Sequence, residues 1–319
     1  MIGNHKIGER MTLALSNTED LIKYMKQQGI KFDIFKEEDT KIFLNECTYY
    51  KKVSCYKKNF MTYKVKGKVL YADLDFAYLK EISSIDADLR SIILSISLNV
   101  EHAVKVWIIN KCLECQFDGF DIAEKFFRKY PVVKDNILKY MHNSYCEELI
   151  FAHKNRMPIW VIVETISFGD LCLLYKFMVD NNYFGDKTKA EIRDSVSILY
   201  SVHNIRNAAA HNHCLLKDLR YSANVSEVVH MISQYVANVD TISRDQRQKA
   251  LRTKFYYDFT CLLYAIDYFM KSDKMKTKAK NSLNNFMKVT AVRNKNYFKS
   301  CNPIKNAYFF FEKILDNYS

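Results

Sequence analysis

Glycine and proline are scarce in this sequence. Its 319 residues include only seven glycines and three prolines, far below average usage in globular proteins. Tight turns and β-hairpins depend on these two residues, so the sequence has little material for them. We therefore expect an all-α protein, and a chain of this length can bury a substantial core.

Secretion and membrane signals are also missing. The first ten residues do not have the form of a signal peptide, and no uninterrupted apolar run approaches the length of a membrane span. The nine cysteines are odd in number and have no framework spacing, which fits a reducing cytoplasm. We expect a cytoplasmic protein that makes no membrane contact.

Two groups of potential metal ligands lack the spacing of a zinc site. Cys112 and Cys115 form a C-x-x-C pair without a second pair, and in a helix they would simply lie one turn apart. The other group, also without a second ligand pair at standard spacing, is His203, His211, His213 and Cys214. We expect no metal and no cofactor.

Positive charge is concentrated in two stretches. The net charge is +12, and residues 51–68 contain seven lysines and no acidic residue. Residues 271–300 contain nine lysines or arginines against Asp273 alone. Localised basic patches suit a polyanion, although such lysines also line solvated helix faces. The expected RNA contacts are Lys51, Lys52, Lys57, Lys58, Lys64, Lys66, Lys68, Lys274, Lys276, Lys278, Lys280, Arg293 and Lys295.

Aromatic side chains are interleaved with these basic residues. If they point outward, they can stack on unpaired bases; if they point inward, they belong to the core. They are Tyr56, Phe60, Tyr63, Phe286, Tyr297 and Phe298.

The most distinctive stretch is 202–216, V-H-N-I-R-N-A-A-A-H-N-H-C-L-L. On an unbroken helix Asn207 and His211 are i,i+4 neighbours, so the amide would orient the imidazole. Arg206 and His211 would lie about 140° apart. For both to reach one phosphate, the helix must end or bend near Ala210, or a second copy must supply the missing group.

These residue types suit RNA cleavage without a metal. Such cleavage needs acid and base groups for the 2′-hydroxyl and the leaving oxygen, and a fixed cation for the charge that develops on the phosphate. Histidine titrates near neutrality and arginine presents a planar fork to phosphate. The candidate roles are Arg206 as cation and His211 as acid/base, with Asn207 orienting one or both. His213 is the second choice for acid/base work, because both spacings are allowed.

The spacing of Arg206 and His211 resembles the R-x4-6-H signature of HEPN-domain ribonucleases. Residues 157–178 resemble the P-x-W-x-x-x-E-x-x-S-F-G block of the Abi-like abortive-infection family of AbiD/AbiF type, and 206–211 match its R-N-x-x-A-H. Residues 49–56 and 86–101 resemble further blocks, Y-Y-R-L-S-G-Y and D-x-x-L-R, so about 12–216 are covered. Cys55 departs from a usual glycine, and Cys214 from a common basic residue.

The resemblance implies a bacterial, metal-independent endoribonuclease that leaves 2′,3′-cyclic phosphate and 5′-hydroxyl ends and acts in anti-phage growth arrest. Because one motif is present and HEPN sites generally use two, it also implies a homodimer, and an associated small structured RNA is a further expectation. Two alternatives stay open: a non-catalytic RNA-binding protein that uses the same motif, and a scaffold protein whose basic patches are incidental.

The expected architecture is an HEPN-like helical bundle with additional N- and C-terminal helices. We place an N-terminal helical region with a basic segment at 1–72, a core with the motif at 73–220, and a C-terminal region at 221–319. The core helices are expected over 73–114, with a break near Ser83 and Ser84, over 157–178 as one central helix, and over 188–210. The outer helices are expected at 15–29, 37–47, two around Pro131 within 118–150, and at 224–240, 246–270, 280–292 and 303–317.

Three charged residues are expected to support the site. Glu164 is the one acidic residue in the first half of its apolar helix, so it needs a partner. Arg206 is a sensible one, and the alternative is that Glu164 pairs with a lysine or caps a neighbouring helix. Arg90 and Glu101 interrupt the 73–114 helix. A buried, paired structural role is expected for both rather than a catalytic one.

Overall fold

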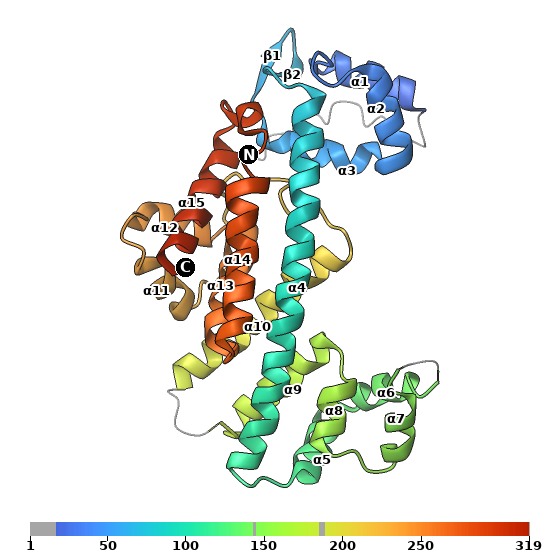
Figure 1. Ribbon diagram of the computed structural model, residues 1–319, viewed down its shortest axis with the longest axis vertical. Helices are drawn as coiled ribbons and strands as arrows, with labels where there is room; N and C mark the ends of the chain where they lie inside the picture. The colour runs from blue at the N-terminus through green and yellow to red at the C-terminus, as the bar shows by residue number, and fades with distance from the viewer. Residues whose placement is uncertain (1–16, 143–144, 185–188, 319) are drawn as a thin grey trace, which may run out of the picture.

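The computed structural model describes residues 17–142, 145–184 and 189–318, with the side chains of Lys189 and Ala190 excepted. The described chain is all-α as expected, with fifteen α-helices and one two-stranded sheet. Its longest element is α4, Phe76–Glu114, which runs nearly the full length of the molecule (Figure 1). At 1.5 Å per residue, this helix is about 58 Å long.

Three groups of elements are arranged along α4 (Figure 1). The N-terminal group surrounds its first turns, a second group covers its far end, and the C-terminal helices pack along one side. The first group is α1 (Thr18–Gln27), α2 (Glu37–Ile42), α3 (Tyr50–Ser54), β1 (Thr62–Val65) and β2 (Lys68–Tyr71). The second is α5 (Gly119–Lys129), α6 (Pro131–Lys139), α7 (Glu147–His153), α8 (Ile159–Thr165) and α9 (Phe168–Asp180). The others are α10 (Lys189–Ala210), α11 (His230–Ala237), α12 (Arg244–Leu251), α13 (Lys254–Phe269), α14 (Asp273–Asn285) and α15 (Asn302–Tyr318).

The expected break in α4 near Ser83 and Ser84 does not occur. The Ser84 hydroxyl donates to the carbonyl of Lys80, one turn earlier, so the helix itself satisfies it. The apolar stripe that predicted this helix forms its buried face, including Ile82, Leu89 and Ile93. By length and composition alone α4 could cross a membrane, a test that a core helix of a soluble protein also passes; it packs here against α10 and α13.

The expected single helix over 157–178 is wrong. The chain forms two helices, α8 and α9, separated by Ile166 and Ser167 in extended conformation. Ser167 caps α9 by accepting a hydrogen bond from the Asp170 amide at 3.1 Å. Serine is a preferred N-cap, so this local signal ends one helix and starts the next within an otherwise continuous apolar run.

Several outer elements differ from the expected ranges. The basic segment includes a β-hairpin, in which Lys66 and Gly67 form the two-residue turn with φ of 45° and 78°. Both positive values are what a type I′ turn needs, so one of the few glycines supplies it. The expected 224–240 helix is only α11, and 246–270 divides into α12 and α13. Two expected helices continue as π-helices, after α2 at Phe43–Cys47 and after α14 at Phe286–Thr290. The domain boundaries at 72 and 220 stay predictions.

One buried carboxylate joins three segments that lie far apart in the sequence. Asp86 on α4 is fully buried. Its Oδ2 accepts from the Tyr56 hydroxyl at 2.7 Å and from Arg90, and its Oδ1 accepts from the Leu215 and Leu216 amides at 3.0 and 2.9 Å. Burial raises the pKa of Asp86, whereas these donors lower it. The carboxylate therefore fixes the chain just after the 206–211 motif.

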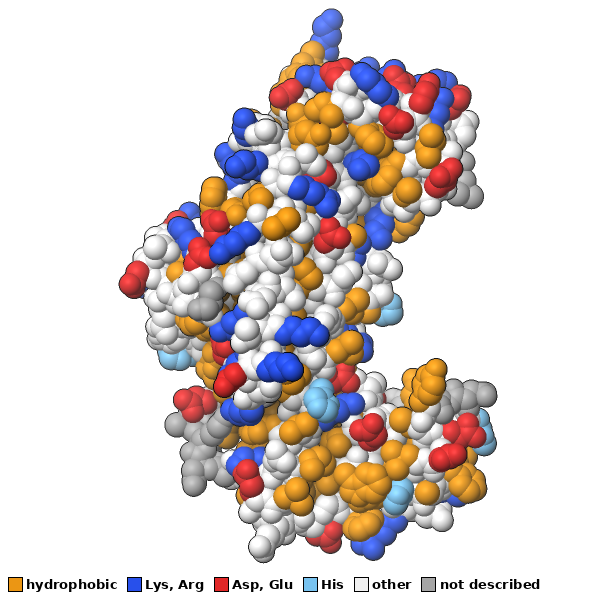
Figure 2. All heavy atoms as spheres, in the orientation of Figure 1, with side chains coloured by type: hydrophobic (Ala, Val, Ile, Leu, Met, Phe, Trp, Pro, Cys, Tyr) orange, Lys and Arg blue, Asp and Glu red, His pale blue; other side chains and the backbone are white. Residues whose placement is uncertain are grey.

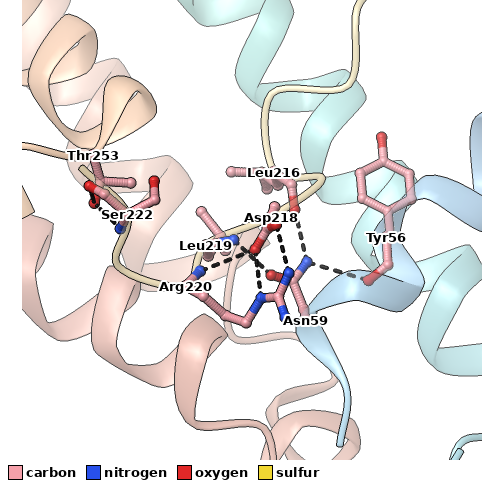
Figure 3. A network of polar contacts seen from close by, with 8 residues as sticks. All are labelled: Tyr56, Asn59, Leu216, Asp218, Leu219, Arg220, Ser222 and Thr253. Atoms are coloured by element: carbon pink, nitrogen blue, oxygen red, sulfur yellow. Dashed lines mark hydrogen bonds and ion pairs between the residues drawn. The ribbon is translucent and has the colours of Figure 1, made fainter. Parts of the chain in front are cut away.

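Asn59 makes a second clamp on the same segment (Figure 3). Its amide nitrogen donates to the Leu216 carbonyl at 2.8 Å, and its amide oxygen accepts from the Leu219 backbone at 2.7 Å. Asn59 is buried, so both groups of its amide are satisfied out of water. Residues 215–219 are thus held by two side chains from different elements.

We expect Asp86→Asn to lower the free energy of unfolding by about 3–5 kcal/mol, because it leaves the Arg90 guanidinium buried without a counter-charge. Urea unfolding followed by circular dichroism measures this. The matched control is Asp135→Asn on α6, an exposed aspartate, which should change stability by less than about 0.5 kcal/mol. Similar effects from the two variants would contradict a structural role for the Asp86 network.

Candidate functional site

The motif lies at the C-terminal end of α10. The helix ends after Ala210, and the next residues reverse the chain: the Asn212 amide donates to Ala209 at 3.1 Å, and the His213 amide donates to Ala208 at 2.8 Å. Asn212 has a φ of 54°. These features define a Schellman motif. The helical hydrogen bonds continue to the His211 amide, which donates to the Asn207 carbonyl at 2.9 Å, and the chain leaves the helix at Asn212.

The two histidines of the motif are exposed beyond the helix end. His211 and His213 have ring centroids 6.0 Å apart, and both side chains face solvent. Figure 1 places the end of α10 beside the middle of α4, and Figure 2 shows that the molecule is notched between the groups α1–α3 and α5–α8. The histidines are therefore accessible to a large substrate.

Arg206 is held by neighbours that leave part of it accessible. Its Nη1 donates to the Asn207 side-chain oxygen at 2.9 Å, and its Nη2 lies 3.9 Å from Glu101 Oε2. The guanidinium lies 5.8 Å from the centre of the Phe168 ring. With 29% of its side chain exposed, Arg206 keeps donor capacity for an external anion.

The partner of Arg206 is Glu101 and not Glu164. Glu164 is exposed on α8 and makes no ion pair within the described residues, so the expectation that it pairs with Arg206 or with a lysine is wrong. Its carboxylate points to water because the buried side of α8 is occupied by Val161, Ile162 and Val163. Glu101 also lies 3.5 Å from Lys105.

Asn207 orients a different histidine from the expected one. Its amide nitrogen is 2.8 Å from Nε2 of His203, one turn before it, whereas the only bond to His211 is backbone, with the His211 amide donating to the Asn207 carbonyl at 2.9 Å. The expectation that the Asn207 amide fixes the His211 ring is wrong, because both ends of that amide are bonded elsewhere, to Arg206 and to His203. Asn207 does orient Arg206, as expected.

His203 is a half-buried histidine whose ring is hydrogen-bonded and packed within the protein. It lies half-buried against Phe168, with ring centroids 5.6 Å apart, and a Cβ on Gly169 would come within 3.2 Å of its Nε2. Gly169 therefore makes room for this imidazole. Burial, and then the nearby Arg206 charge, lower the pKa of His203, which favours the neutral ring.

Arg90 and Glu101 have the structural surroundings expected of them. Arg90 is buried and pairs with Asp86, four residues earlier. Glu101 is largely buried and lies between Arg206 and Lys105, with its Oε2 lacking a hydrogen-bond donor among the described residues. A buried oxygen of this kind is an orienting charge for Arg206 rather than a surface group.

The expected basic contacts divide into two classes. Three are committed to the protein itself: Lys57 is buried, Arg293 pairs with Glu81 and Asp88, and Lys280 lies 3.3 Å from Asp267. The others reach the surface wholly or partly, and they are Lys51, Lys52, Lys58, Lys64, Lys66, Lys68, Lys274, Lys276, Lys278 and Lys295. Figure 2 shows lysine and arginine side chains along most of one face, interspersed with acidic ones.

The aromatic residues of the basic stretches are mostly structural. Tyr56, Phe286 and Phe298 are buried. Phe60 and Tyr297 both stack on the Tyr78 ring, with centroid distances of 6.4 and 5.0 Å. Of the expected stacking side chains, Tyr63 on β1 is the one with a largely exposed ring, at 48%, so it is the best placed for a base.

Cys55 and Cys214, the two departures from the family pattern, are in contact. Their thiols share a hydrogen bond, and Cys214 Sγ lies 3.6 Å from the Lys52 carbonyl. The bond from Cys55 lowers the pKa of Cys214 to about 6, against the effect of burial, and it raises that of Cys55.

Among the residues that the structure describes, no three His, Cys, Asp or Glu side chains gather where they could hold a metal ion. The candidate ligands near the motif have separate partners: His203 is hydrogen-bonded to Asn207, and Cys214 is hydrogen-bonded to Cys55. Cys112 is buried, whereas Cys115 is exposed.

The fold and site together define a helical protein with an arginine and two histidines at the end of a buried helix. Residues 42–217, more than half of the chain, match the family model described as Abi-like protein. The chain belongs to this Abi-like family, which indicates a role in abortive infection, a defence against phage. No curated protein and no solved structure matches it.

The buried lysine Lys57 is expected to make the stability of the protein depend on pH. Its ammonium donates to Gln28 at 2.7 Å and to Tyr50 at 3.0 Å, and burial lowers its pKa from 10.5 to about 8. Between these values the unfolded chain holds one more proton, so the contribution of this group to stability increases with pH. Below pH 8, the burial of the charged Lys57 ammonium lowers the free energy of unfolding by about 3 kcal/mol.

We therefore expect the stability of Lys57→Met relative to wild type to fall by about 3 kcal/mol as the pH rises from about 7.5 to 10.5. Urea unfolding at several pH values measures the difference. Lys58→Met, at the exposed neighbouring residue, should give a pH-independent difference. A flat difference for Lys57→Met would show that its ammonium is solvated.

Proposed function

We propose that the chain is a metal-independent endoribonuclease of HEPN type that acts in anti-phage growth arrest. Arg206 binds the phosphate and stabilises its developing charge, and His211 transfers protons, with His213 as the alternative group. Glu101 and Asn207 position the guanidinium. The expected products carry 2′,3′-cyclic phosphate and 5′-hydroxyl ends.

The observation that carries this proposal is the helix end at Ala210. His211 is the last residue whose amide makes a helical hydrogen bond, to the Asn207 carbonyl at 2.9 Å, so it lies about 140° around the helix from Arg206, and a second copy would supply the group missing from each side. Arg206 is braced but accessible, and both motif histidines are exposed. The cation and the proton-transfer groups thus lie in the last turns of one helix and just after it, at an accessible surface.

A homodimer would complete the site. The side chains of His211 and His213 have no hydrogen-bond partner in the described part of the chain. A second copy would supply groups that orient these imidazole rings, and it would also supply a second arginine. On α4, next to Glu101, three large apolar side chains are exposed on one helix face: Leu98 at 55%, Val106 at 44% and Leu113 at 70%. This stripe suits the same face of a second α4.

Non-catalytic RNA binding is the second candidate. It is favoured by the exposed lysines of the β-hairpin, Lys64, Lys66 and Lys68, which flank the exposed Tyr63 ring. A basic hairpin with one aromatic face is suited to a single-stranded segment of a structured small RNA. Binding of this kind would also serve the nuclease, so catalysis must be tested separately.

We expect purified protein to cleave end-labelled RNA in EDTA, and we expect Arg206→Ala and His211→Ala each to reduce the rate by about 100-fold or more. His230→Ala, at an exposed histidine on α11, is the matched control and should cleave normally. Filter binding at several salt concentrations checks that the variants still bind RNA. Intact RNA with salt-sensitive binding in every sample would favour the non-catalytic function.

Light scattering after size exclusion tests the dimer. We expect wild-type protein to elute as a dimer and Leu98→Lys/Val106→Lys as a monomer without cleavage activity, because burying two lysines in an apolar contact is unfavourable. Val289→Lys changes a similarly exposed valine, at 58%, on the π-helix after α14, and should stay dimeric. A monomeric, active wild-type enzyme would refute the two-copy site.

A further inference from the structure

A large apolar cavity lies away from the motif, between α4 and the C-terminal helices. Its volume is about 460 Å³, within the range of small-molecule sites. Its wall is formed by α4, α13 and α15, with the chain after α14 completing it. Representative wall residues are Ile85, Leu89, Phe259, Met287, Ala307 and Phe311.

Positive charge is gathered at the rim of this cavity. Lys295, Lys299 and Lys305 line it, and none of the three makes an ion pair with a carboxylate of the described chain. Glu312 is the one acidic residue in the lining, and it accepts a hydrogen bond from Tyr308 at 2.8 Å. The rim therefore has a net positive charge over an apolar interior.

The wall also contains an uncommon backbone. Phe286 and Met287 line the cavity from the π-helix that follows α14, where the Ala291 amide donates to the Phe286 carbonyl at 2.8 Å. Such turns are rare and occur frequently at functional sites. In addition, Phe309 lines the cavity although its side chain is 51% exposed, so an aromatic ring lies at the opening.

The chemistry of the lining selects among ligands. A nucleobase needs hydrogen-bond partners for its edges, but the interior consists mainly of aliphatic and aromatic side chains. A hydrocarbon chain needs no such partners. A purely neutral hydrocarbon would make no use of Lys295, Lys299 and Lys305. An apolar chain that ends in an anion satisfies both parts of the site.

We propose that this cavity binds a single-chain amphiphile with an anionic head, of the fatty-acid class. The acyl chain lies between α4, α13 and α15, and the carboxylate lies at the rim beside Lys299 and Lys305. Leu216 and Leu219 form part of the same wall, so the ligand contacts the segment that Asp86 and Asn59 anchor. This site is separate from the ribonuclease proposal and does not depend on it.

The test is titration of the full-length protein with cis-parinaric acid, a fluorescent fatty acid, followed by displacement with oleate. We expect saturable binding at one site per chain. Lys299→Glu/Lys305→Glu should weaken it by about tenfold or more, and Ala307→Trp should abolish it by filling the cavity. Lys271→Glu, at an exposed lysine outside the lining, is the charge-matched control and should bind normally.

Two further experiments distinguish binding of an anionic chain in the cavity from binding of a neutral chain or of a membrane surface. Oleyl alcohol, which has the chain without the charge, should displace the probe much less well than oleate; equal displacement would overturn the anionic assignment. Flotation with phosphatidylglycerol vesicles distinguishes a membrane surface: binding to vesicles without saturable binding of the free acid would overturn the cavity site. If Ala307→Trp fails to fold by circular dichroism, the lysine variant decides, and unchanged binding in it refutes the proposal.

Discussion

The carboxylate of Asp86 is the interaction on which the arrangement of the motif depends. It is fully buried, and it accepts hydrogen bonds from a tyrosine of the N-terminal group, from Arg90 of its own helix and from two backbone amides after the motif. A charge in such a position is stable only when its hydrogen-bonding capacity is filled. The donors therefore act together, because moving any one of these segments would leave the buried carboxylate without one of its hydrogen bonds.

The 206–211 motif occupies a boundary between rigid and accessible structure. Its N-terminal part belongs to a helix that packs on α4, α9 and α13, and its C-terminal part lies directly before a tight reversal at Asn212. Rigid elements give precision to a site, while a helix end gives access. Arg206 is held precisely by the rigid helix, and His211 is accessible at the helix end. Both residues lie within 42–217, the part of the chain that matches the family model.

The sequence predicted what depends on local periodicity and failed where tertiary contacts decide. The α10 boundaries were expected at 188–210 and lie at 189–210, and helices lie before and after Pro131 as expected, although a third one, α7, also falls within 118–150. The break at Ser167 was missed because an apolar run hides a cap. Glu101 on α4 and Glu164 on α8 are both acidic residues in largely apolar surroundings, and only packing shows which one faces Arg206. The choice of Asn207 between His203 and His211 likewise depends on side-chain packing, which the sequence pattern does not contain.

The anchor at Asp86 holds backbone amides rather than side chains. An amide is common to every residue except proline, so this attachment places few demands on which amino acids occupy the segment. Residues near it are free to diverge while the chain path stays the same. Cys214, directly before the two anchored amides, contacts the protein through its thiol and the Lys52 carbonyl and not through the Asp86 anchor. The path of the chain there is thus fixed independently of the side chains that it carries.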